Sequence, residues 1–312
     1  MHSQVTNRGP FLRQGAIEAG HTKYDLDGPA YHQLFGSVRV TTQSRLTPDI
    51  LARAAILVVP DAVISHHSAA RLHGAVVPED SSTHVTVSTA RQRRRRKGLM
   101  VHVGRDLQTE RRGSLLLTSP AQTFCDLADH LLLVDLVVLG DSFVHRGCLD
   151  PATLLAVVDA MTTGARRLAR EAAEMVRTGV ESPMETRVRL MMVFAGLPEP
   201  AINITIRGVD DEVRYRLDLS YPELRLAIEY DGRHHAEDAS QWGHDIRRRE
   251  WLDDHRWRLL VLRAPDVYDT PWETVRRIGV ILGTRGYDKP LPVDPPAAFR
   301  IHFPGRPWKA GR

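Results

Sequence analysis

Apolar and polar positions follow different patterns in two parts of the chain, and the change falls near residue 180. In the first part, residues 47–59 have helical apolar spacing behind an N-cap threonine and a first-turn proline, which predicts a helix. Runs of β-favouring residues at 34–40, 83–88 and 99–105 predict strands among such helices. We therefore predict an N-terminal α+β domain over residues 1–178.

Beyond residue 180 the pattern is more regular. One helix, three strands, a helix, a strand and a last helix are expected in this order: 182–198, 201–207, 212–220, 224–232, 240–254, 257–263 and 270–282. Ser182 with Glu185, and Thr270 with Glu273, have capping-box spacing. Three successive strands favour a meander, and the strand–helix–strand step adds a parallel pairing. The prediction for residues 180–285 is a mixed α/β domain with an α-βββ-α-β-α core and a mixed sheet.

The two ends of the chain carry weaker patterns. Two short helices at 11–20 and 22–26, followed by the strand at 34–40, fit a shortened winged-helix element within residues 10–45, with no recognition helix assigned. Residues 286–312 are rich in proline, and we expect a tail without regular structure.

Composition limits the class of protein. Of the 312 residues, 42% are hydrophobic and 26% are charged, which is ordinary for a globular protein. No apolar run is long enough to predict a membrane span, and the first residues lack a signal-peptide core. The only cysteines, Cys125 and Cys148, exclude a disulfide framework and a four-cysteine zinc site. We expect a cytoplasmic protein.

Positive charge is concentrated in two blocks, although the net charge is only +4. Residues 91–97 read RQRRRRK and include Arg93, Arg94, Arg95 and Arg96; residues 246–250 read IRRRE. Such blocks bind nucleic-acid phosphates by releasing counterions, and they also occur simply as solvated loops. DNA is the partner that we expect.

Two carboxylates stand out at the ends of apolar strands. Asp218 interrupts the second strand of the expected meander, and Glu229 ends the third. If these strands are neighbours, both side chains converge, and a pair of carboxylates suits a hard cation such as Mg²⁺ or Mn²⁺. A charge on a buried strand costs free energy unless it is paired or used, so we predict a functional role for this pair.

Residues 181–281 resemble a known family. The segments YRLDLSYPELRLAIEYDGRHH and QWGHDIRRREWLDDHRWRLLVLR are similar to the bacterial "domain of unknown function 559" group, relatives of the very-short-patch-repair endonucleases with a PD-(D/E)xK-like, restriction-endonuclease-like fold. The resemblance implies a metal held by Asp218, Glu229 and the backbone carbonyl of Tyr230. Asp231 replaces the lysine of the family motif.

The same resemblance implies roles for further residues. Glu185 would lie near the metal, and His235, or else His234, would transfer the proton while Asp245 orients it. Arg248 or Arg249 would contact phosphate.

Structural interpretations stand beside several of these roles. Glu185 could serve only as a capping residue, Asp245 and Arg249 could form an ion pair along a helix, and Asp231 with Gly232 could be a turn. We interpret His66 and His67 as helix-start or packing residues, because no other metal ligand lies at a suitable spacing.

We expect a metal-dependent DNA endonuclease, acting in repair or in defence against foreign DNA. The alternative is a catalytically inactive nuclease-fold protein that binds DNA as a regulator. The N-terminal half is faintly similar to abortive-infection type IV antitoxins, which adds the alternative of an antitoxin-like protein with a protein partner. Substrate preference, oligomeric state and pathway stay open.

Overall fold

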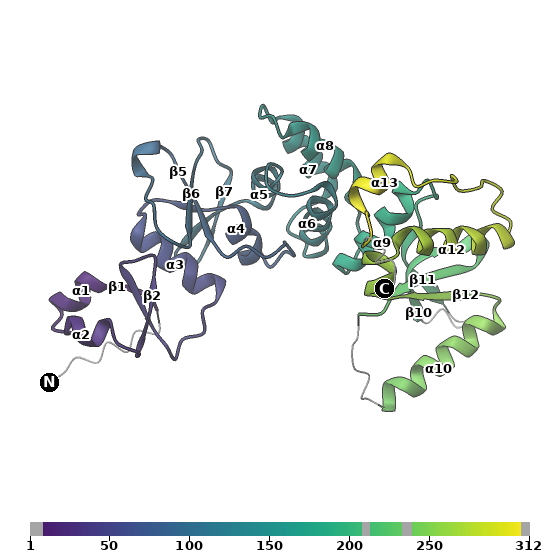
Figure 1. Ribbon diagram of the computed structural model, residues 1–312, viewed down its shortest axis with the longest axis horizontal. Coiled ribbons are helices and arrows are strands. Elements are labelled where there is room, and N and C mark those ends of the chain that lie inside the picture. The colour runs from purple at the N-terminus through teal and green to yellow at the C-terminus, as the bar shows by residue number, and fades with distance from the viewer. Residues whose placement is uncertain (1–8, 208–212, 233–238, 307–312) are drawn as a thin grey trace, which may run out of the picture. The chain divides into compact units, whose positions relative to one another are not determined.

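The computed structural model describes residues 9–207, 213–232 and 239–306 and confirms a mixed α/β protein. The chain divides into two units, Met1–Val176 and Arg177–Arg312, and Figure 1 shows the elements of each. No helix within the described ranges is both long and apolar enough to cross a membrane.

The first unit begins with a small α/β module. Its elements are β1 (Phe11–Leu12), α1 (Arg13–Glu18), α2 (Lys23–Leu26), β2 (Tyr31–Leu34) and β3 (Val38–Thr41). The strands form an antiparallel sheet of order β1-β3-β2. The single strand expected at 34–40 is therefore wrong, because the chain reverses through Phe35 and Gly36, which both have positive φ angles, into a hairpin.

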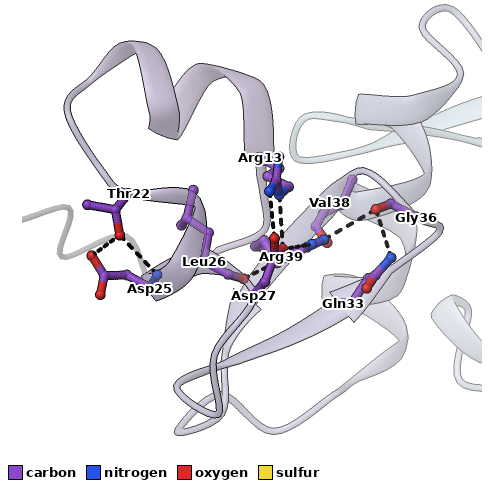
Figure 2. A network of polar contacts seen from close by, with 9 residues as sticks. All are labelled: Arg13, Thr22, Asp25, Leu26, Asp27, Gln33, Gly36, Val38 and Arg39. Atoms are coloured by element: carbon purple, nitrogen blue, oxygen red, sulfur yellow. Dashed lines mark hydrogen bonds and ion pairs between the residues drawn. The ribbon is translucent and has the colours of Figure 1, made fainter.

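One buried arginine holds this module together, as Figure 2 shows. The Arg39 guanidinium donates hydrogen bonds to the carbonyls of Leu26, Gly36 and Val38 and pairs with Asp27 at 2.6 Å. Arg13 also binds Asp27, and these hydrogen bonds hold the pKa of the Asp27 carboxyl well below its usual range. A buried guanidinium is tolerated because carbonyls and a carboxylate satisfy its donors.

A five-stranded mixed sheet forms the body of the first unit, with the order β6-β5-β4-β8-β7. Its strands are β4 (Val63–Ile64), β5 (Thr83–Val87), β6 (Leu99–Val103), β7 (Thr109–Arg112) and β8 (Leu115–Thr118). The helices α3 (Pro48–Val58) and α4 (His66–Leu72) pack against β5. Strands β5 and β6 pair in parallel, so the arginine-rich segment between them is a crossover and not a hairpin loop.

Four helices complete the first unit: α5 (Pro120–Leu127), α6 (Leu133–His145), α7 (Pro151–Asp159) and α8 (Arg166–Met175). Ser119 and Asp150 cap α5 and α7, each accepting a hydrogen bond from a first-turn N–H. Helix α6 was not predicted, because it is buried along most of its length and lacks a polar face that would reveal its period.

The second unit has the predicted α-βββ-α-β-α order. It contains α9 (Pro183–Phe194), β9 (Ala201–Arg207), β10 (Val213–Tyr221), β11 (Leu226–Tyr230), α10 (Ala239–Asp254), β12 (Arg258–Leu262) and α12 (Pro271–Thr284). The sheet order is β12-β11-β10-β9, antiparallel except for the parallel β11–β12 pair. In Figure 1, α9 and α12 lie on one side of this sheet and α10 on the other.

Two expectations for the second unit are wrong. Thr270 makes no capping hydrogen bond from its side chain, and α11 (Ala264–Tyr268) precedes it instead of a loop. The proline-rich tail contains α13 (Ala297–His302), whose Phe299 is buried, packs against Trp272 and so anchors the tail.

Candidate active site

Asp218 and Glu229 lie side by side on neighbouring antiparallel strands. Leu219 on β10 pairs with Ile228 on β11, and continuing this register by one residue sets Asp218 opposite Glu229. Directly opposite residues project from the same face of a sheet. The Tyr230 N–H also donates a hydrogen bond to Asp218, at the end of β11. The predicted convergence of the two carboxylates is therefore present.

Glu185 reaches the same region from the first turn of α9. Ser182 caps this helix, and Glu185 is buried. Its Oε2 atom accepts hydrogen bonds from the Glu181 N–H at 3.0 Å and from Asn203 Nδ2 at 3.2 Å. Burial raises the pKa of the Glu185 carboxyl, and the Asp218 charge adds to that increase. Glu185 thus accepts a hydrogen bond at the start of α9, from the Glu181 N–H, and lies within electrostatic reach of Asp218.

Asn203 was missed by the sequence analysis. It has a positive φ of 46°, unusual for a residue other than glycine, and its side-chain amide donates to the Gly179 carbonyl as well as to Glu185. The available signal was an asparagine in the middle of an isoleucine- and threonine-rich strand, where it is disfavoured.

Arg248 of α10 contacts Glu229 directly. Its two terminal nitrogens bond the two carboxylate oxygens, Nη1 to Oε2 at 3.1 Å, and Nη2 also donates to the Arg216 carbonyl at 2.7 Å. Bidentate pairs of this kind are among the stronger polar contacts in proteins. Arg249 is more exposed and faces the same cavity.

The cavity at these side chains measures about 310 Å³. It is lined by Asp218, Glu229, Tyr230, Asp231, Gly232, Arg248, Arg249, Leu259 and Val261. Asp231, which stands at the lysine position of the family motif, donates its N–H to the Leu262 carbonyl, and its carboxylate lies 3.9 Å from Arg263. Its backbone therefore extends the β11–β12 pairing past the end of the strand.

The oxygen donors fit a hard divalent cation. Asp218 and Glu229 supply two adjacent carboxylates, the number that Mg²⁺ commonly takes from a protein. Burial raises the pKa of Asp218, while the Arg248 charge and the Tyr230 N–H oppose that change. A cation that binds Glu229 would have to compete with Arg248 for that carboxylate.

Three predicted site residues cannot be placed. His234 and His235 lie outside the described residues, and Asp245 is on α10 with its side chain outside the described set.

The arginine-rich segment belongs to the first unit. Arg93, Arg94, Arg95 and Arg96 are exposed between a short 3₁₀ helix (Ala90–Gln92) and β6, beside a cavity of about 540 Å³. Arg94 and Arg96 donate to backbone carbonyls of the same segment, which shapes the loop.

No family model matches the chain. Two proteins from different strains of Mycobacterium tuberculosis, both named as uncharacterized proteins, are 29% identical to it over 235 residues. The match covers 74% of this chain and 86% of each mycobacterial protein. Because 235 residues exceed the length of either unit, the similarity extends into both.

Proposed function

We propose that the second unit is a metal-dependent endonuclease domain that hydrolyses phosphodiester bonds in DNA. The observation that carries the proposal is the pair Asp218 and Glu229, opposite each other on β10 and β11 in a cavity that also contains two arginines. Mg²⁺ or Mn²⁺ would be held by these two carboxylates and by the Tyr230 carbonyl. When bound, such an ion supplies Lewis-acid polarisation of a phosphate and makes water a better nucleophile at neutral pH.

The protein's own residues would bind and orient the DNA. Arg248, on release from Glu229, and the exposed Arg249 can both donate to a phosphate oxygen at the mouth of the cavity. Glu185 interacts electrostatically with Asp218. His235, oriented by Asp245, is our proposal for the proton-transfer group. The exposed arginines of the first unit would add phosphate contacts without reading sequence.

A second candidate is favoured by a specific contact. The bidentate Glu229–Arg248 pair neutralises one proposed ligand from inside the protein, and Asp231 replaces the motif lysine. Both features are compatible with a nuclease fold that binds DNA as a regulator, with or without a protein partner, and catalyses nothing. In either form, we propose that the protein acts on DNA in the cytoplasm.

A cleavage assay tests the proposal. Supercoiled plasmid, mismatched duplex and single-stranded DNA would be incubated with the protein and Mg²⁺, Mn²⁺ or a chelator. We expect metal-dependent nicking that falls at least about 100-fold in the Asp218→Asn, Glu229→Gln double variant, because both ligand charges are lost.

The matched control is Glu250→Gln with Asp253→Asn, which removes two exposed carboxylates from α10 and should cleave normally. Nicking that persists in the double variant would point to a contaminating nuclease. Salt-sensitive DNA binding by all variants without any cleavage would select the regulator instead.

A further inference from the structure

Four histidines from separate segments of the chain meet in the first unit. They are His66 at the start of α4, His84 on β5, His102 on β6 and His130 after α5. The His66 and His102 rings stack with centroids 3.7 Å apart, and His84 Nδ1 lies 3.0 Å from His102 Nε2. The paired β5 and β6 strands bring His84 and His102 together, and no short sequence spacing could reveal this.

The cluster is built from imidazoles that are largely removed from water. His66 and His84 are buried, and His102 is half-buried. His84 Nδ1 and His102 Nε2 are within hydrogen-bond distance of each other. Imidazole is the commonest metal ligand among protein side chains.

Besides the clustering itself, the backbone at His66 indicates a ligand-binding role. His66 has a φ of 51°, a conformation that costs free energy in residues other than glycine and is enriched at functional sites.

We propose that His66, His84 and His102 form a zinc-binding site. One nitrogen of each ring lies within 4.8 Å of the others. Zn–N bonds of 2.0–2.1 Å at tetrahedral angles place ligand nitrogens roughly 3.3 Å apart, close to the His84–His102 separation. The His66 ring must tilt out of its stack on His102, because a metal lies in the plane of each imidazole that binds it.

Asp80 would orient His84 from outside the set of metal ligands. His84 turns Nδ1 toward His102 and Nε2 toward Asp80, so a metal on Nδ1 leaves Nε2–H to donate to the carboxylate. Carboxylate–histidine–metal chains of this kind orient the ring and increase its basicity. A second cluster shares His84 with the first and consists of His67, Asp80 and His84. In that cluster Asp80 would be a metal ligand and His102 would not.

The adjoining cavity favours the first cluster. His66, His102 and His130 line a cavity of about 710 Å³ together with Arg93, Arg105 and Asp129. Three histidines with a fourth position open to a cavity are the arrangement of zinc sites that bind an exchangeable water or ligand. Zinc is the metal we assign, since three imidazole donors with an open fourth position are a known zinc coordination.

Metal binding by the full-length, tag-free protein tests the site. After chelator treatment, the protein would be dialysed against Zn²⁺ and its metal content measured, and Co²⁺ would be titrated as a spectroscopic probe. All variants would carry Asp218→Asn and Glu229→Gln, so that the paired carboxylates of the second unit contribute no ligands. We expect one zinc per chain and the visible absorption of tetrahedral Co²⁺.

The identity of the ligands is tested by comparing the zinc affinity of variants at the proposed ligands with that of variants at adjacent residues. His66→Gln and His102→Gln should weaken binding more than 100-fold, Asp80→Asn about 10- to 100-fold, and His67→Gln hardly at all. His102 is only partly buried, so its variant remains informative if His66→Gln fails to fold by circular dichroism. Less than stoichiometric zinc in the parent, unchanged affinity in His102→Gln, or loss in His67→Gln equal to that in Asp80→Asn would overturn the assignment.

Discussion

At the scale of single residues, Arg248 competes with any cation for Glu229. Replacing Arg248 with glutamine removes the competing charge, so we expect Mg²⁺ to bind about 10-fold more tightly, a change of about 1.4 kcal/mol. If Arg248 also donates to phosphate, cleavage should nevertheless fall about 100-fold. Calorimetric titration of Mg²⁺ and the nicking assay measure the two effects separately.

Arg249→Gln is the neighbouring control, because the exposed Arg249 makes no bidentate pair with Glu229 in the described structure. It should leave Mg²⁺ affinity nearly unchanged. An Arg248→Gln protein that binds Mg²⁺ no better than the parent would refute the competition.

Asp126 on α5 gives the first unit a pH-dependent stability. Its Oδ1 accepts a hydrogen bond from Gln122, whereas Oδ2 is buried without a hydrogen-bond partner among the described residues. Burial raises the pKa of Asp126 to about 6. The folded protein thus holds this proton more tightly than the unfolded chain does. The contribution of Asp126 to stability is therefore greatest below about pH 4 and is lost as the pH rises through 6.

Asp126→Asn should therefore stabilise the protein at pH 8 by about 2–3 kcal/mol and have little effect at pH 4. Urea unfolding at pH 4, 6 and 8 measures the difference. Asp129→Asn, at an exposed position nearby, should show no such trend. Equal stabilisation at all three pH values would show that the carboxylate charge is not the cause.

At the scale of elements, close packing in the first unit depends on a glycine in α6. A Cβ added to Gly140 would lie 2.4 Å from Val176 and 3.1 Å from Phe124, which leaves no room for a methyl group. Gly140→Ala should destabilise the protein by about 1–3 kcal/mol through overpacking. Gly283 in α12 has open space around it, and Gly283→Ala should be neutral or stabilise by about 0.5–1 kcal/mol.

Chemical unfolding of both variants provides the comparison. If Gly140→Ala is as stable as the parent, α6 must tolerate a shift away from Val176, and the packing argument fails.

How far the sequence predicts an element depends on how local its cause is. Helix α9 was predicted because Ser182 and Pro183 mark its start, and β9 to β12 because their apolar runs are short and bounded. Helix α6 was not predicted, because it is buried along most of its length. The β2–β3 hairpin was not predicted, because its turn depends on positive φ angles at Phe35 and Gly36. Strand register brought Asp218 and Glu229 together as predicted, but the Arg248 contact and the histidine cluster depend on tertiary packing.

At the scale of the whole molecule, the two units carry different chemistry. The arginine-rich segment with Arg93 to Arg96 belongs to the first unit and the paired carboxylates to the second. The match to the mycobacterial relatives is longer than either unit, so it includes residues of both units. Under the proposed function, the first unit would bind the same DNA on which the second unit is proposed to act.

The salt dependence of DNA binding measures that contribution. The logarithm of the DNA-binding constant falls as the logarithm of the salt concentration rises. Each phosphate contact that is lost makes this negative slope shallower by about 0.9. Replacing Arg93, Arg94, Arg95 and Arg96 with glutamine should therefore make the slope shallower by up to about 3.6 and weaken binding to all sequences alike. The control replaces four exposed arginines scattered over the chain, Arg45, Arg167, Arg276 and Arg300. Both variants lose the same net charge, so an equal change in slope would mean that overall charge, and not the arginine-rich segment, attracts the DNA.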